Sequence, residues 1–143
     1  MSTMHFDDGT GSERPSLRMV LLSFPIACFT LALLTDLAYW ATANLLWQNF
    51  SAWLLFAGLV GGGLAVLAWI VWQVVARGRV VWSAVIANLL VLAAAFVNSL
   101  VHAGDGWTGV VPWGLALSAV TVLLMLVAGF LGATTIRDRS HRS

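Results

Sequence analysis

Four long apolar runs, separated by short polar segments, dominate the pattern of the chain. They cover residues 19–40, 52–74, 80–102 and 109–135. Each reaches the roughly 20 residues that a helix needs to cross the hydrocarbon core of a bilayer. Backbone polar groups in hydrocarbon must be satisfied within their own segment, which favours helices. The pattern therefore predicts an all-α integral membrane protein built as a bundle of four transmembrane helices.

The composition supports a single membrane domain. Of the 143 residues, 60% are hydrophobic and 9% are charged, whereas soluble domains carry about 25% charged residues. We expect a flexible tail at residues 1–16, a four-helix membrane domain at 17–135 and a second tail at 136–143, which leaves no room for a soluble catalytic domain. The formal net charge of +1 gives no electrostatic reason to expect nucleic acid as a partner.

The basic residues predict the orientation of the bundle. All seven lie in the chain ends or between the second and third runs, at Arg14, Arg18, Arg77, Arg79, Arg137, Arg139 and Arg142. Because cytoplasmic loops are enriched in Lys and Arg, both termini are predicted to be cytoplasmic and the loops near Asn44 and Asp105 to face outward. A cleaved signal peptide is the alternative for the first run, but its flank is long and mixed in charge rather than short and basic.

Aromatic residues form two groups that agree with this topology. Trp and Tyr collect at the two headgroup levels of a bilayer. The inner group is Trp69, Trp72 and Trp82, and the outer group is Tyr39, Trp40, Trp47, Trp53, Trp107 and Trp113.

Small residues in the second and fourth runs predict close helix packing. Helices in lipid gain little hydrophobic energy from contact, so small residues four apart are used to let backbones approach. The packing candidates are Gly58 with Gly62, Gly61 with Ala65, and Gly114 with Ser118.

Polar residues share one face of the third run. Asn88, Asn98 and His102 fall in a series with Ala84, Val91 and Ala95 at alternating spacings of four and three, the spacing of a packed helix seam. We therefore expect Asn88, Asn98 and His102 to point into the bundle.

Asp36 is the one acidic residue inside the first run, on a face with Cys28 and Ala32. A charged Asp costs roughly 2.5–3.5 kcal/mol at the centre of a bilayer, so it requires a partner or a proton. Asn98 and His102 are expected at a similar depth. We infer a polar cluster of these three residues at the outward end, covered by the loop that contains Asp105 and Trp107. The alternative is that Asp36 and Asn98 only join helices by hydrogen bonds.

The chain offers few residues for cofactor or covalent chemistry. Its histidines are His5, His102 and His141, so one chain cannot hold haem between two intramembrane histidines, and a zinc site lacks ligands. The single Cys28 excludes an intramolecular disulfide. No serine has the spacing of a catalytic nucleophile. We predict no metal and no catalytic residue, and haem is disfavoured.

Two stretches resemble the bacterial family of membrane proteins named domain of unknown function 2231. They are "SFPIACFTLALLTDLAYWATANLLWQNFSAWLLFAGLVGGGLA" and "VNSLVHAGDGWTGVVPWGLALSAVTVLLMLVAGFLG", which together cover most of residues 20–132. The resemblance implies a four-helix protein of the bacterial inner membrane without an established activity, expected near genes for Rieske-type proteins, cytochromes and periplasmic sugar dehydrogenases. Arg18 and Met19 stand where many relatives have His-Pro, which removes ligand candidates for a metal.

Three hypotheses for function follow. The leading one is a noncatalytic inner-membrane subunit or anchor that binds a periplasmic oxidoreductase or cytochrome, or seats a quinone headgroup. Its binding candidates are Asp36, Asn98, His102, Asp105, Trp107 and Trp113. The second hypothesis is a small proton-coupled transporter, acting as a homodimer, in which Asp36 is the exchanged carboxylate. In the third, the protein is purely structural and its polar residues fix the helix register.

Overall fold

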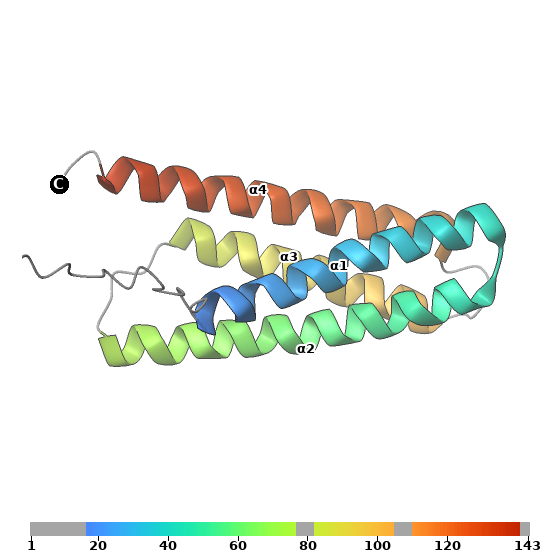
Figure 1. Cartoon of the computed structure of the whole chain (residues 1–143), viewed down its shortest axis with the longest axis horizontal. Coiled ribbons are helices and arrows are strands. Elements are labelled where there is room, and N and C mark those ends of the chain that lie inside the picture. Colours follow the sequence, from blue (N-terminus) through green and yellow to red (C-terminus); the bar gives the residue numbers. More distant parts are fainter. Residues whose placement is uncertain (1–16, 77–81, 105–109, 141–143) are drawn as a thin grey trace, which may run out of the picture.

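The part of the chain that the structure describes forms four long antiparallel helices (Figure 1). The computed structural model describes residues 17–76, 82–104 and 110–140. The helices are α1 (Leu17–Thr42), α2 (Leu45–Ala76), α3 (Trp82–Gly104) and α4 (Leu115–Ser140), with a short segment η1 (Val110–Gly114) before α4. All four are long and apolar enough to cross a membrane, which confirms the predicted four-helix membrane architecture.

The four helices pack as two pairs, the first helix with the second and the third with the fourth. The α1–α2 and α3–α4 pairs pack most extensively, and the two pairs join through α1 with α4 and α2 with α3. We call the end of the bundle at the α1–α2 connection the Asn44 end, and the end where α2 finishes the Ala76 end. The start of α1 and the finish of α4 both lie toward the Ala76 end (Figure 1).

The α1–α2 connection is only two residues long, Ala43 and Asn44. Ala43 adopts a left-handed backbone with φ of 50°, and its N–H donates to the carbonyl of Tyr39 at 2.7 Å, as at many helix C-termini. The Asn44 Oδ1 then accepts from the Leu46 N–H at 3.0 Å and caps the next helix. This cap starts α2 at Leu45, earlier than the predicted start at residue 52.

The enclosed core occupies the half of the bundle toward the Asn44 end. Each helix contributes one buried seam with spacings mainly of three and four, and η1 extends the seam of α4. The buried residues are Pro25, Cys28, Phe29, Ala32 and Asp36 on α1; Ser51, Leu55, Gly58, Gly61 and Gly62 on α2; Val91, Ala95, Asn98 and His102 on α3; and Val110, Gly114, Ser118 and Thr121 on η1 and α4. Toward the Ala76 end, no described side chain is buried beyond these seams. One half of the bundle is therefore closed and the other is not.

Three glycines of α2 mark the closest helix contacts. A Cβ added at Gly58 would lie 2.5 Å from Phe29 Cε1, and one at Gly61 would lie 2.4 Å from Phe24 Cδ1, both on α1. A Cβ at Gly62 would lie 2.6 Å from Leu92 Cδ2 on α3. The absence of a side chain thus lets aromatic rings and a leucine lie directly on the α2 backbone. Ala65, the predicted partner of Gly61, is half-buried in the open half.

The outer surface has the character expected for contact with lipid. Large apolar side chains are exposed along all four helices, where a soluble bundle would carry charge. Exposed tryptophans lie in two groups: Trp40, Trp53 and Trp113 toward the Asn44 end, and Trp72 and Trp82 toward the Ala76 end. Two such aromatic belts are typical of a protein that crosses both headgroup layers.

Substituting Gly58 by Ala should destabilise the bundle. Ala favours a helix over Gly by about 1 kcal/mol, but the added methyl overlaps the buried Phe29 ring, and overpacking of this kind costs about 1–3 kcal/mol. We expect a net loss of about 1 kcal/mol, measured by denaturation in detergent micelles. Gly63→Ala is the matched control, because no atom lies within 4 Å of its added Cβ. It should stabilise the protein, and equal effects of the two substitutions would contradict the packing described.

Candidate functional site

Asp36 is completely buried between three helices. Its α1 backbone places it on the same face as Ala32 and Cys28, and its carboxylate reaches side chains of α3 and α4. Oδ1 lies 3.0 Å from His102 Nε2, and Oδ2 accepts a hydrogen bond from Ser118 Oγ at 2.5 Å. Both carboxylate oxygens therefore have a partner, which a buried acid needs in a medium of low dielectric constant.

Ser118 links Asp36 to Asn98. The Asn98 Nδ2 donates to Ser118 Oγ at 2.7 Å, while the Ser118 hydroxyl proton is given to Asp36. A hydroxyl that accepts and donates at once polarises both bonds. Asn98 and Ser118 are buried with 0% and 1% of their surface exposed, so water does not compete for these bonds.

His102 is oriented by its own helix. Its Nδ1 lies 3.0 Å from the backbone carbonyl of Asn98, one turn earlier in α3. A carbonyl can only accept, so Nδ1 carries a proton. The other nitrogen, Nε2, faces both Asp36 Oδ1 at 3.0 Å and Ser51 Oγ at 3.2 Å. Ser51 also lies 3.4 Å from the carbonyl of Ala32, so its hydroxyl bridges α1 and α3.

The contact between Asp36 and His102 requires one proton. With Nδ1 protonated, either Nε2 donates to a carboxylate, or a carboxylic acid donates to a neutral imidazole. The net charge of the pair is zero in both arrangements. A neutral pair avoids the cost of an isolated buried charge, which is severe in hydrocarbon.

We call these five residues, Asp36, Ser51, Asn98, His102 and Ser118, the Asp36 cluster. Asp36 comes from α1, Ser51 from α2, and Ser118 from α4, while α3 supplies the other two. Asp36 and His102 are on diagonal helices and therefore meet on the axis of the bundle. The Asp36 cluster thus joins all four helices by hydrogen bonds between side chains.

Two buried acceptors, one within the Asp36 cluster and one on α2, have no hydrogen-bond partner within the described part of the chain. One is Asn98 Oδ1, and the other is Gln48 Oε1, one turn before Ser51 on α2. Each is able to accept a proton donor. In the described ranges, Asp36 and His102 are not joined by a third residue of a kind that would complete a metal site.

The structure brings together Asp36, Asn98 and His102, the three residues that were expected to form a polar cluster. Trp113 lies elsewhere, with 68% of its surface exposed. Asp105 and Trp107 are outside the described residues. Ser118, selected from the sequence only for helix packing, is a hydrogen-bonding member of the cluster, and Gly114 is buried one turn before it.

Asn88, which was expected to point into the bundle with Asn98 and His102, is not buried with them. Its side chain is exposed, and its Nδ2 donates to the Ala84 carbonyl of its own helix at 2.8 Å. The reason is that α3 is enclosed only from Val91 onward. The helical spacing correctly placed Asn88 on the face of the seam, but none of the described residues encloses it there.

Ser51 was not predicted as a site residue, because the second span was placed at residues 52–74. The signal was nevertheless present, since Ser51, Leu55, Gly58 and Gly62 continue one seam at spacings of four, three and four. Recognising Asn44 as a helix cap would have extended the seam to Ser51.

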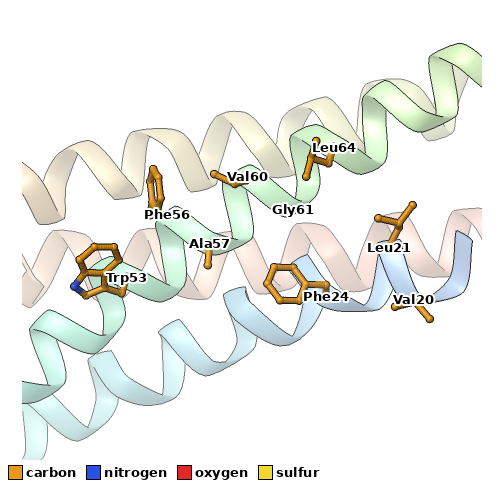
Figure 2. Close-up of a pocket in the computed structure, with 9 residues that line it drawn as sticks. All are labelled: Val20, Leu21, Phe24, Trp53, Phe56, Ala57, Val60, Gly61 and Leu64. Atoms are coloured by element: carbon orange, nitrogen blue, oxygen red, sulfur yellow. The ribbon is translucent and has the colours of Figure 1, made fainter. Parts of the chain in front are cut away.

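A separate apolar groove of about 640 Å³ lies between α1 and α2. Figure 2 shows Phe24 beneath Gly61, with Trp53 toward one end and Val20 and Leu64 toward the other. Its lining is made of apolar and aromatic side chains, so hydrocarbon suits it. The groove contains no member of the Asp36 cluster.

Four lipid-compatible helices around a buried polar cluster define a multi-pass helical membrane protein. Residues 18–140 match the sequence model of the family described as "Predicted membrane protein (DUF2231)". The chain therefore belongs to this family, which confirms the resemblance noted in its sequence. No curated protein and no solved structure matches the chain.

Two substitutions of Asp36 should show how much its hydrogen bonds, rather than apolar packing at the same position, contribute to the stability of the bundle. In Asp36→Asn, the amide N–H can donate to Nε2 of a neutral His102 while the amide oxygen accepts from Ser118, so we expect a loss within about 1 kcal/mol. Asp36→Leu removes the carboxylate that His102 Nε2 and the Ser118 hydroxyl contact, and losing one member of a buried pair costs about 3–5 kcal/mol. Denaturation in detergent measures both values. Similar losses in the two variants would contradict the hydrogen-bond pattern.

Proposed function

We propose that the protein is a noncatalytic multi-pass subunit or anchor of the bacterial inner membrane that associates with a periplasmic redox protein or with a quinone. The observation that carries this proposal is the enclosure of the Asp36 cluster, whose hydrogen bonds fix all four helices against one another. A bundle fixed in this way is suited to present a constant surface to a partner.

The burial of Asp36 and His102 argues for a supporting role rather than a catalytic one. Asp36 is 0% exposed and His102 is 6% exposed, and both are hydrogen-bonded to protein. A general acid or base must reach the proton that it transfers to substrate. The Asp36 cluster therefore holds the helices in place, and contact with a partner falls to other residues.

The exposed aromatic residues at the Asn44 end are the candidate contact surface. Trp40, Trp53 and Trp113 each expose about two thirds of their surface there, and aromatic side chains are enriched at protein interfaces. The arginine distribution supports a periplasmic location for this end and a cytoplasmic location for both termini. Asp105 and Trp107, in the segment between α3 and η1, are further candidates. The class of partner is supported by the redox setting that the family resemblance implies.

The test is copurification from membranes in mild detergent, with quinone measured by solvent extraction and chromatography and periplasmic redox proteins by mass spectrometry. Trp40→Leu combined with Trp113→Leu should reduce the bound redox protein or quinone at least about tenfold, since a central Trp often contributes 2 kcal/mol or more. Trp72→Leu with Trp82→Leu, at the opposite end, is the matched control and should retain the partner. Equal retention by both double variants would refute the proposed surface.

One observation favours a second candidate function, proton-coupled transport. The Asp36–His102 pair holds a proton inside the membrane span, and intramembrane carboxylates often exchange protons in transporters. Transport would require the Asp36 cluster to open, which breaks hydrogen bonds to α3 and α4. A homodimer with Asp36 as the exchanged carboxylate remains the specific form of this candidate.

Proteoliposomes containing a pH-sensitive dye distinguish the two functions. The anchor function predicts no proton flux above that of empty vesicles. A transporter predicts flux that is lost in Asp36→Asn, a variant expected to keep its fold because its amide can replace both hydrogen bonds. Flux that survives in Asp36→Asn would exclude Asp36 as the exchanged group.

A further inference from the structure

The apolar groove between α1 and α2 has the size of a small-molecule site. Its volume of about 640 Å³ is within the range of about 300–1,000 Å³ for ligand pockets. Its lining extends along α2 from Trp53 to Leu64, which is about 16 Å along the helix axis. Phe24 of α1 lies against Gly61 and forms the floor (Figure 2). Both helices are membrane spans at this level, so a molecule that fills the groove comes from the lipid phase.

Trp53 places a hydrogen-bond donor at one end of this groove, inside the hydrocarbon region. It lies eight residues after Leu45, the first residue of α2, which is about 12 Å along the helix axis from the α1–α2 connection. The span Val20–Thr42 has 23 residues and is about 34 Å long, close to the roughly 30 Å of the hydrocarbon core. The connection therefore lies near the headgroup level, and Trp53 lies well below it.

The indole N–H of Trp53 meets no acceptor in the part of the chain that the structure describes. The ring packs edge-on against Phe56 and is 65% exposed. Figure 2 shows its nitrogen on the side away from Ala57, at the end of the groove. A donor without a partner in an apolar medium costs free energy, and acyl chains contain no acceptor. The groove and the N–H together call for an apolar molecule that carries an acceptor at this depth.

We propose that the groove binds a quinone, with its isoprenoid tail along α1 and α2 and a ring carbonyl that accepts the Trp53 N–H. A quinone is neutral, dissolves in the bilayer and carries its carbonyl oxygens at the end of an apolar tail. A phospholipid could bring a carbonyl to this depth only by drawing its charged headgroup into hydrocarbon, which is costly. This inference rests on the proposed function, of which it specifies the quinone form.

The first test measures labelling of the full chain in phosphatidylcholine nanodiscs by a photoreactive azido derivative of decylubiquinone. Labelling should be saturable, map to α2 near Trp53, and be competed by decylubiquinone better than by the same benzoquinone without a tail. Trp53→Phe keeps an aromatic ring but removes the N–H. It should weaken binding about two- to twelvefold, since a neutral hydrogen bond contributes about 0.5–1.5 kcal/mol. Trp72→Phe, at the opposite end of α2, is the matched control and should bind as the unmodified protein does.

A second pair of variants tests the groove itself. Val60 lines the groove and is 48% exposed, so Val60→Phe should partly fill it without disturbing the core and should reduce saturable labelling. Val71 is also exposed on α2 but lies outside the groove. Val71→Phe makes the same change there and should leave the labelling unaltered.

The outcomes separate this inference from the proposed function. Saturable labelling that maps to Trp40 or Trp113 and is insensitive to Trp53→Phe and Val60→Phe would overturn the groove site but retain quinone binding. Labelling that rises linearly with probe concentration would show only partition into lipid and would also overturn it. In that case, a redox protein that still copurifies with the chain would leave the anchor function standing.

Discussion

The hydrogen-bonded pair of Asp36 and His102 is the interaction on which the bundle depends most. Apolar contact gives helices in lipid little reason to associate, because acyl chains solvate them equally well. A buried acid changes this balance, since leaving it without a partner in hydrocarbon is costly. Asp36 receives its partners only when α1 meets α3 and α4. Ser51 brings α2 into the same arrangement, so one acidic residue specifies the positions of all four helices.

Glycine packing and the Asp36 cluster act on the same half of the bundle. Gly58, Gly61 and Gly62 allow Phe29, Phe24 and Leu92 to lie against the α2 backbone, and the polar side chains follow toward the Asn44 end. The first feature brings helices close enough for short hydrogen bonds, and the second fixes their rotation. Beyond this region the described side chains are half-buried or exposed, and none of them is fully buried. The division into a closed half and an open half therefore follows from where the glycines and polar residues occur.

Sequence patterns predicted the number of helices and much of the Asp36 cluster. Apolar length identified four spans because hydrocarbon thickness sets a minimum for each. Helical spacing selected Asp36, Asn98 and His102, since buried polar residues in lipid require partners. The same spacing failed for Asn88, because whether a neighbouring helix covers a face depends on how far the helices diverge. Ser51 was not predicted as a member because the start of the second helix was placed too late in the sequence. Ser118 was predicted only as a packing residue, because spacing does not show which helix lies opposite.

The two-residue connection between α1 and α2 has a consequence for biosynthesis. Ala43 and Asn44 hold the first two helices as a hairpin that needs nothing from the later chain. Within this hairpin the Ser51 hydroxyl already has the Ala32 carbonyl nearby. The side-chain partners of Asp36, by contrast, are all in α3 and α4, which the ribosome makes last. The nascent hairpin must therefore enter the bilayer with its acid either protonated or near the aqueous boundary, and arrival of the second hairpin completes its insertion.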